Sequence, residues 1–217
     1  MTDAPTISLL AIAAVIAYFL GSVPTAYLAG KLYGKDIFNV GSRQAGATNV
    51  WREVSRTAGI AVFLVDSAKG LGAILVARWL GVEGASLMLP SSAVILGHWN
   101  SPFTRFRGGD GVSSLTGVVL GINALTALPA FLVVAFVTLR FNSRLEHPTL
   151  WGAMFGYMLY IVAALTPVAP VEPVVVFGIT GLGLAILLHS MVYHHRRMGV
   201  QQEHIQAAEE PKERRLS

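Results

Sequence analysis

Long apolar runs divided by short polar segments constrain the fold of this chain more than any other feature of its sequence. Seven such runs lie at roughly 7–31, 57–80, 86–97, 111–122, 124–140, 149–165 and 173–192. Charged residues make up only 13% of the 217 residues, against about a quarter in a soluble domain, and the mean hydropathy is +0.59. Such runs are typical of helices that cross a membrane. The sequence therefore predicts an all-α, polytopic membrane helix bundle of about seven transmembrane helices.

One apolar stretch, 111–139, is too long for a single crossing. As one helix its 29 residues would extend roughly 44 Å, whereas the hydrocarbon core of a bilayer is about 30 Å thick. A break near Gly121, Ile122 and Asn123 divides it into two helices, of which the first is short. The run at 86–97 is also short. Because both short helices flank one glycine-rich segment, we expect them to line a cleft that is buried in protein.

The positions of the basic residues orient the predicted helices. With seven crossings and the N-terminus outside, 14 of the 16 lysines and arginines fall in cytoplasmic segments, and only Lys69 and Arg78 do not. Six crossings would place the last seven of those 14 outside, against the positive-inside rule. We therefore expect a membrane-embedded domain over residues 1–198 and a polar cytoplasmic tail over residues 199–217.

The first predicted cytoplasmic loop, residues 39–52, has the composition of an anion site. It contains two glycines, and its hydrogen-bonding and cationic residues are Ser42, Arg43, Thr48, Asn49 and Arg52. Backbone N–H groups at glycine turns and arginine side chains suit a phosphate. An ordinary positive-inside connection with turn residues is the alternative interpretation.

The second predicted cytoplasmic loop is rich in glycine and runs directly into an apolar helix. Gly108, Gly109 and Gly111 allow the backbone to approach an anion closely, and the next helix presents its positive N-terminus. Arg105 and Arg107 add positive charge.

Two ionisable residues of the same segment have more than one interpretation. His98 is able to act as an acid, a base or a hydrogen-bond donor near neutral pH. Asp110 would compete with a phosphate for the amides of the loop, but an aspartate before an apolar run is also a good helix cap. Capping and a ligand site remain alternatives here.

Asp66 and Lys69 lie three residues apart, on one face of an apolar helix. Ionisable residues at such depth are energetically costly and usually paired, so they indicate either a functional site or a structural ion pair between helices. In the first run, Ser22 and Pro24 are packing or kink elements, with a place in the cleft wall as the alternative.

Several chemistries are excluded by the sequence. The chain has no cysteine, so it has no disulfide, no cysteine–zinc site and no thiol nucleophile. It also lacks a G-x-S-x-G elbow and a zinc-binding H-E-x-x-H helix. Adjacent His194 and His195 point to different faces of a helix, which argues against a metal site built from them alone. We predict no metal and no cofactor.

Taken together, four segments resemble the bacterial acyl-phosphate:glycerol-3-phosphate acyltransferases, the integral membrane PlsY-type family. The segments are GSVPTAYLAGKLYGKDI in the first run, GSRQAGATNVWR, AGIAVFLVDSAKG and GHWNSPFTRFRGGDGV. The resemblance implies a seven-helix enzyme of the bacterial inner membrane. Such enzymes transfer a fatty acyl group from acyl phosphate to the 1-hydroxyl of sn-glycerol 3-phosphate and form lysophosphatidic acid, an early step of phospholipid synthesis.

The resemblance also implies roles for individual residues. We expect the catalytic residues to be Ser42, Arg52 and His189. We expect substrates to be bound by Thr48, Asn49, Lys69, His98, Arg107, Gly108, Gly109 and Gly111. An acyl phosphate is an activated anhydride, so holding two phosphates and aligning the hydroxyl supplies most of the acceleration without a covalent nucleophile.

Each motif departs from the pattern of the family at one or more positions. Gln44 stands where the family usually has asparagine, and Asp110 stands where it has lysine. In the third motif, which includes His189 and Gly199, the expected asparagine, arginine and glutamate are replaced by Val192, His195 and Gln201.

Three functions follow from the sequence. The leading one is the acyltransferase, with acyl phosphate and glycerol 3-phosphate as substrates, membrane lipids around it, and a soluble acyl-phosphate-producing enzyme as a candidate partner. No nucleic acid is expected. The second is an altered or catalytically weakened paralogue that binds lipid intermediates. The third is a small membrane transporter, which the clustering of polar motifs at one interface argues against.

Overall fold

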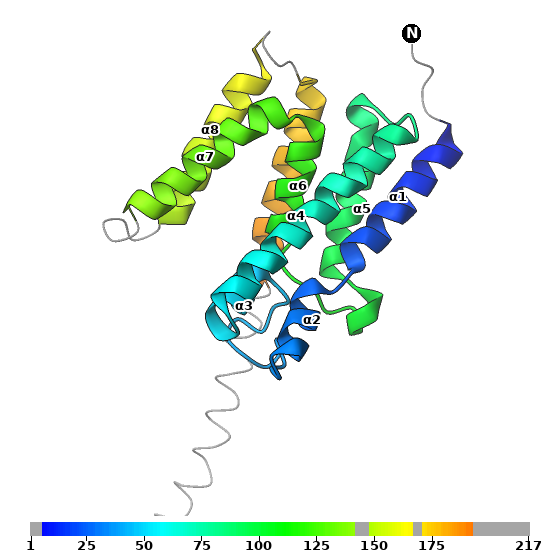
Figure 1. Cartoon of the computed structure of the whole chain (residues 1–217). Coiled ribbons are helices and arrows are strands. Elements are labelled where there is room, and N and C mark those ends of the chain that lie inside the picture. Colours follow the sequence, from blue (N-terminus) through cyan, green and yellow to red (C-terminus); the bar gives the residue numbers. More distant parts are fainter. Residues whose placement is uncertain (1–5, 142–147, 167–170, 193–217) are drawn as a thin grey trace, which may run out of the picture.

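The computed structural model describes residues 6–141, 148–166 and 171–192, which form a bundle of helices (Figure 1). The helices are α1 (Ile7–Ser22), α2 (Thr25–Leu32), α3 (Ala47–Glu53), α4 (Arg56–Trp79), α5 (Met88–Trp99), α6 (Val112–Ile122), α7 (Ala124–Phe141), α8 (Pro148–Ala164) and a last helix, Pro173–Val192, with short 3-10 helices η1 (Gly84–Leu87) and η2 (Pro102–Thr104). The predicted all-α bundle is confirmed. The predicted tail, 199–217, lies outside the described residues.

The breaks between helices follow from local chemistry. The predicted break in the long apolar stretch is confirmed at Asn123, whose side-chain oxygen accepts from the backbone N–H groups of Leu125 and Thr126 at 3.1 and 3.3 Å and so caps α7. The first run is likewise divided, because Pro24 separates α1 from α2. The first loop is shorter than predicted, since its second half forms α3.

Glycines allow the central helices to pack with their backbones in close contact. A Cβ atom added to Gly70 on α4 would lie 2.0 Å from the carbonyl oxygen of Ser114 on α6. A Cβ atom added to Gly117 on α6 would lie 1.8 Å from the carbonyl oxygen of Ser67 on α4. Helices α1 and α5 cross in the same way, through one glycine on each helix. Small residues at such contacts are the usual means of packing helices in membranes.

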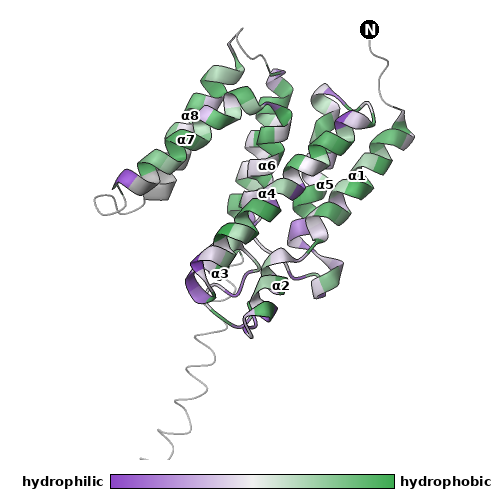
Figure 2. Cartoon of the chain, in the orientation of Figure 1, coloured by the Kyte–Doolittle hydropathy of each residue, from purple (hydrophilic) through white to green (hydrophobic). Residues whose placement is uncertain are grey.

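The outer faces of the bundle are apolar. Figure 2 shows hydrophobic residues along the helices, whereas hydrophilic residues gather near α3 at one end. Three of the described helical segments are long and apolar enough to cross a membrane, namely Ile7–Leu32, Arg56–Trp79 and Pro173–Val192. Shorter apolar helices cover Val112–Ile122, Ala124–Val137 and Met154–Ala164. The number and direction of the crossings stay a prediction.

Candidate active site

The two glycine-containing segments predicted to bind phosphate lie against each other at one end of the bundle. The backbone N–H of Ala45 donates to the carbonyl of Gly108 at 3.2 Å. The guanidinium of Arg107 lies 4.1 Å from the centre of the Phe38 ring and donates to the Phe38 carbonyl at 3.4 Å. The expectation that both segments share one end of the bundle is therefore confirmed.

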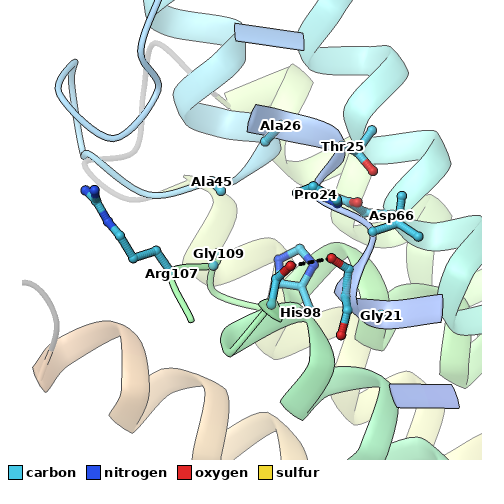
Figure 3. Close-up of a pocket in the computed structure, with 13 residues that line it drawn as sticks. Gly21, Pro24, Thr25, Ala26, Ala45, Asp66, His98, Arg107 and Gly109 are labelled. Atoms are coloured by element: carbon cyan, nitrogen blue, oxygen red, sulfur yellow. Dashed lines mark hydrogen bonds between the residues drawn. The ribbon is translucent and has the colours of Figure 1, made fainter. Parts of the chain in front are cut away.

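A small pocket lies between these segments and the α1–α2 break (Figure 3). It is lined by Asp66 from α4 and His98 from α5, and these side chains are only 1% and 7% exposed. Gly108 and Gly109 form another part of its wall. Arg107 reaches the pocket with its backbone end, and its side chain points away from His98 (Figure 3).

A buried ion pair holds the α1–α2 break against α4. The carbonyl of Val23 lies at the break, where Pro24 interrupts the regular hydrogen bonding of the helix. The Lys69 ammonium donates to this carbonyl and lies 2.6 Å from Oδ1 of Asp66. Asp66 lines the pocket, whereas Lys69 does not. The predicted substrate contact of Lys69 stays a prediction.

The glycine-rich loop encloses the His98 ring because its glycines have no side chains. A Cβ atom on Gly108 would lie 1.9 Å from the His98 carbonyl oxygen, and one on Gly109 would lie 2.4 Å from His98 Nε2. The Gly109 N–H donates to the same carbonyl at 3.3 Å. The ring Nδ1 lies 3.4 Å from the Ser114 hydroxyl. Gly111 has a φ of +93°, which favours glycine at this turn.

Asp110 directly precedes Gly111, which is the N-cap residue of α6, and its side chain contacts the first residue of that helix. Its Oδ1 accepts from the backbone N–H of Val112, the first residue of α6, at 3.1 Å. Its carbonyl accepts from Nε1 of Trp99 at 2.5 Å. The carboxylate therefore satisfies an N–H group at the N-terminus of α6 and is not among the residues that line the pocket.

Asn49 determines the shape of the first loop. It is 3% exposed, and its Nδ2 donates to the carbonyls of Ile37 at 3.1 Å, Val40 at 3.2 Å and Gln44 at 2.9 Å. Its Oδ1 accepts from the backbone N–H of Ser42 at 3.0 Å. These contacts order the loop and leave the Ser42 side chain exposed.

A wider groove runs along α3 and α4. Its volume is about 410 Å³, and its walls are Ala47, Thr48, Trp51, Arg52, Gly59, Ile60 and Phe63. Thr48 and Arg52 project from α3, where both are exposed, and the apolar residues of α4 extend the same surface. The groove thus combines a cation and a hydroxyl with a hydrophobic strip.

The third predicted motif reaches the site through His189 of the last helix. Its ring stacks on the ring of Trp99, with centroids 4.5 Å apart and an interplanar angle of 7°. Val192 ends the last helix, while His194, His195, Gly199 and Gln201 lie outside the described residues. The proposed roles of the motif therefore rest here on His189.

Three residues of the site were missed by the sequence reasoning. No role was predicted for Trp99, which follows His98 directly, or for Ser114, whose hydroxyl faces the His98 ring. Thr25 lines the pocket with a buried hydroxyl that has no hydrogen-bond partner among the described residues. The only sequence feature that indicated a role for Thr25 was its position next to Pro24. Ser22 and Pro24 also line the pocket, as the alternative interpretation of the first run predicted.

Comparison with known proteins gives a consistent result. The family model described as glycerol-3-phosphate acyltransferase matches residues 11–199. A glycerol-3-phosphate acyltransferase of Geotalea daltonii is 40% identical over 126 residues, which cover 58% of this chain and 65% of the relative. One of Thermosynechococcus vestitus is 44% identical over 142 residues, covering 60% and 66%. The aligned segments thus span less than two thirds of these curated relatives.

Solved structures are similar over a larger part of the chain. The crystal structure of PlsY (YgiH), an integral membrane glycerol 3-phosphate acyltransferase, in its glycerol 3-phosphate form has a TM-score of 0.71 and 29% identity, covering 88% of this chain and 92% of that chain. Its lysophosphatidic acid form has a TM-score of 0.68, covering 89% and 91%. With the apolar helices described above, this similarity establishes a multi-pass integral membrane protein.

Proposed function

The chain belongs to the glycerol-3-phosphate acyltransferase family, and we propose that it transfers a fatty acyl group from acyl phosphate to the 1-hydroxyl of sn-glycerol 3-phosphate. The observation that carries this proposal is the contact between the two glycine-containing segments around a pocket that holds Asp66 and His98. A further support is that the similar PlsY structures are described as glycerol 3-phosphate and lysophosphatidic acid forms. The product would be lysophosphatidic acid.

The reaction needs little covalent chemistry from the protein. The oxygen of the glycerol hydroxyl attacks the acyl carbonyl carbon, a carbon–oxygen ester bond forms, and the bond from that carbon to the phosphate oxygen breaks. The phosphate leaves with the bonding electrons, and the hydroxyl proton passes to His189, which adjoins the site through its stack on Trp99 and does not itself line the pocket. His98 and the hydroxyl of Thr25 orient the acceptor in the pocket. Holding the reactants in line accounts for most of the acceleration.

The groove on α3 and α4 suits the acyl donor. Arg52 and Thr48 hold the phosphate of the donor, because a guanidinium and a hydroxyl match its oxygens. Ile60 and Phe63 hold the first carbons of the acyl chain. Ser42, which is exposed beside the ordered Asn49, completes the site between the two substrates.

Purified protein in detergent, supplied with acyl phosphate and labelled glycerol 3-phosphate, tests the proposal through the yield of labelled lysophosphatidic acid. Arg52→Ala is expected to lower turnover about a hundredfold or more, because a donor aimed at developing charge is lost. Arg56→Ala is the matched control, since Arg56 is exposed at the start of α4 and does not line the groove. Wild-type turnover in Arg52→Ala would show that Arg52 is not part of the active site.

One observation favours a second function, the binding of lipid intermediates without turnover. Asp110 brings a carboxylate to a loop where the PlsY-type pattern has a cation. Binding of lysophosphatidic acid to a protein that yields no product would support this second function. Solute flux into liposomes without product would support a transporter.

The orientation and surroundings are part of the proposal. The basic residues support an inner-membrane protein with its N-terminus outside and its C-terminus in the cytoplasm. The substrates then enter from the cytoplasm, where a soluble enzyme that produces acyl phosphate is a candidate partner.

A further inference from the structure

Trp99, the last residue of α5, contacts two separate parts of the site with one ring. Its face stacks on the ring of His189, with centroids 4.5 Å apart and an angle of 7° between the planes. Its Nε1 donates to the carbonyl of Asp110 at 2.5 Å. The loop also packs on the indole, because a Cβ atom on Gly111 would lie 3.0 Å from Nε1.

These contacts join elements that the chain does not connect directly. His189 belongs to the last helix, whereas Asp110 belongs to the loop between α5 and α6. An indole is rigid and has only two rotatable side-chain bonds, so fixing its N–H also fixes the plane of its face. The hydrogen bond to the loop therefore determines the plane against which the imidazole lies.

We propose that Trp99 is a positioning residue, which sets the orientation of the His189 ring relative to the glycine-rich loop. This inference rests on the proposed function, in which His189 accepts the proton of the acceptor hydroxyl. Trp99 acts through its two neighbours and does not line the pocket. Its removal should impair the chemical step more than the binding of glycerol 3-phosphate.

The first experiment measures the stack without any turnover. The chain has four tryptophans, so replacing Trp51, Trp79 and Trp151 by Phe leaves Trp99 as the only one. A protonated imidazole quenches indole fluorescence on contact, and the titratable groups that face His189 among the described residues are Asp110 and His98. Emission of this variant is expected to fall as the pH is lowered and the imidazole becomes protonated.

Two further variants complete this experiment. Adding His189→Gln to the Trp99-only protein should abolish the fall in emission at low pH. A variant that keeps only Trp79 should not show this fall either, because Trp79 is 84% exposed. A flat titration of the Trp99-only protein, or a fall that persists after His189→Gln, would overturn the proposed stack.

The second experiment separates positioning from stability. We expect Trp99→Leu to lower kcat about a hundredfold, since a misplacement of about 1 Å has such an effect, with KM for glycerol 3-phosphate within about twofold. Trp99→Phe keeps a ring but loses the N–H donor, and a partial rescue to about a tenfold loss is expected. Trp79→Leu and Trp79→Phe are the controls and should match wild type.

The outcomes distinguish this inference from the proposed function. An unchanged kcat in Trp99→Leu, or a loss that appears only in KM, contradicts the positioning role. If the wild-type protein makes no lysophosphatidic acid, the proposed function fails and so does the role of Trp99 in it, whereas the fluorescence titration still decides whether the stack exists.

Discussion

Replacing Lys69 by Met should destabilise the fold strongly, because Asp66 would then be buried without its partner. Asp66 is 1% exposed and lies 2.6 Å from the Lys69 ammonium. Removing one member of a buried ion pair typically costs about 3–5 kcal/mol. The Val23 carbonyl also loses a donor. For a chain of this size each kcal/mol lowers the unfolding temperature by about 2–4 °C, so we expect a fall of roughly 6–20 °C.

Removing both charges should be less damaging than removing one. In Asp66→Asn with Lys69→Met, no unpaired charge stays buried, and the main remaining loss is the hydrogen bond to the Val23 carbonyl, about 1–2 kcal/mol. The expected fall in unfolding temperature is about 2–8 °C. Thermal unfolding in one detergent at one scan rate measures both variants. Lys31→Met is the control, because Lys31 is exposed and contacts only the face of Tyr27, at 4.9 Å, in the described interactions.

The difference in unfolding temperature between the single and the double variant tests whether the ion pair stabilises the fold. If both unfold at the same temperature, Asp66 gains nothing from the ammonium, and the ion pair does not hold the α1–α2 break. A double variant less stable than the single one would refute the reasoning outright.

Three further predictions concern packing, charge and topology. Gly117→Ala should lower the unfolding temperature, because its Cβ atom would lie 1.8 Å from a backbone oxygen of α4, whereas Gly72→Ala on α4 meets nothing within 4 Å and should be neutral or stabilising by about 0.5–1 kcal/mol. Asp110→Asn keeps an oxygen for the Val112 N–H but removes the negative charge, so KM for glycerol 3-phosphate should fall about tenfold while the unfolding temperature stays the same. An unchanged KM would show that the charge of Asp110 does not repel the bound phosphate. The chain has no cysteine, so a single introduced cysteine reports its own side of the membrane. Tyr33→Cys should react with an impermeant maleimide only from the cytoplasmic side, and Glu83→Cys should react only from outside. Labelling of both from one side would contradict the seven-crossing topology.

The positions of the helices were predictable because a bilayer limits how long an apolar helix can be. That argument placed a break at residues 121–123, and the structure has it at Asn123, with the Arg78 guanidinium 2.7 Å from the preceding carbonyl of Ile122. It did not predict α3, since seven residues with mixed polarity carry no clear helical period.

The glycine-rich loop and His98 were also predictable, because residue types there report backbone geometry and charge. The stack of Trp99 on His189 was not, since it joins segments that are distant in the sequence. No local pattern indicates which aromatic ring a histidine of another helix will meet. The Lys69 contact with Val23 was missed for a similar reason, because this carbonyl becomes accessible to a side chain of α4 only where Pro24 interrupts the helix.

Two of the departures from the PlsY-type pattern, at positions 44 and 110, fall where the fold uses something other than the lost side chain. Gln44 contributes its backbone carbonyl to Asn49, so this contact does not depend on the side chain at position 44. Asp110 uses its carboxylate and its carbonyl to hold α6 and Trp99. Neither residue is among those that line the pocket. We therefore expect the proposed catalysis to be retained in this chain, with a weaker hold on phosphate.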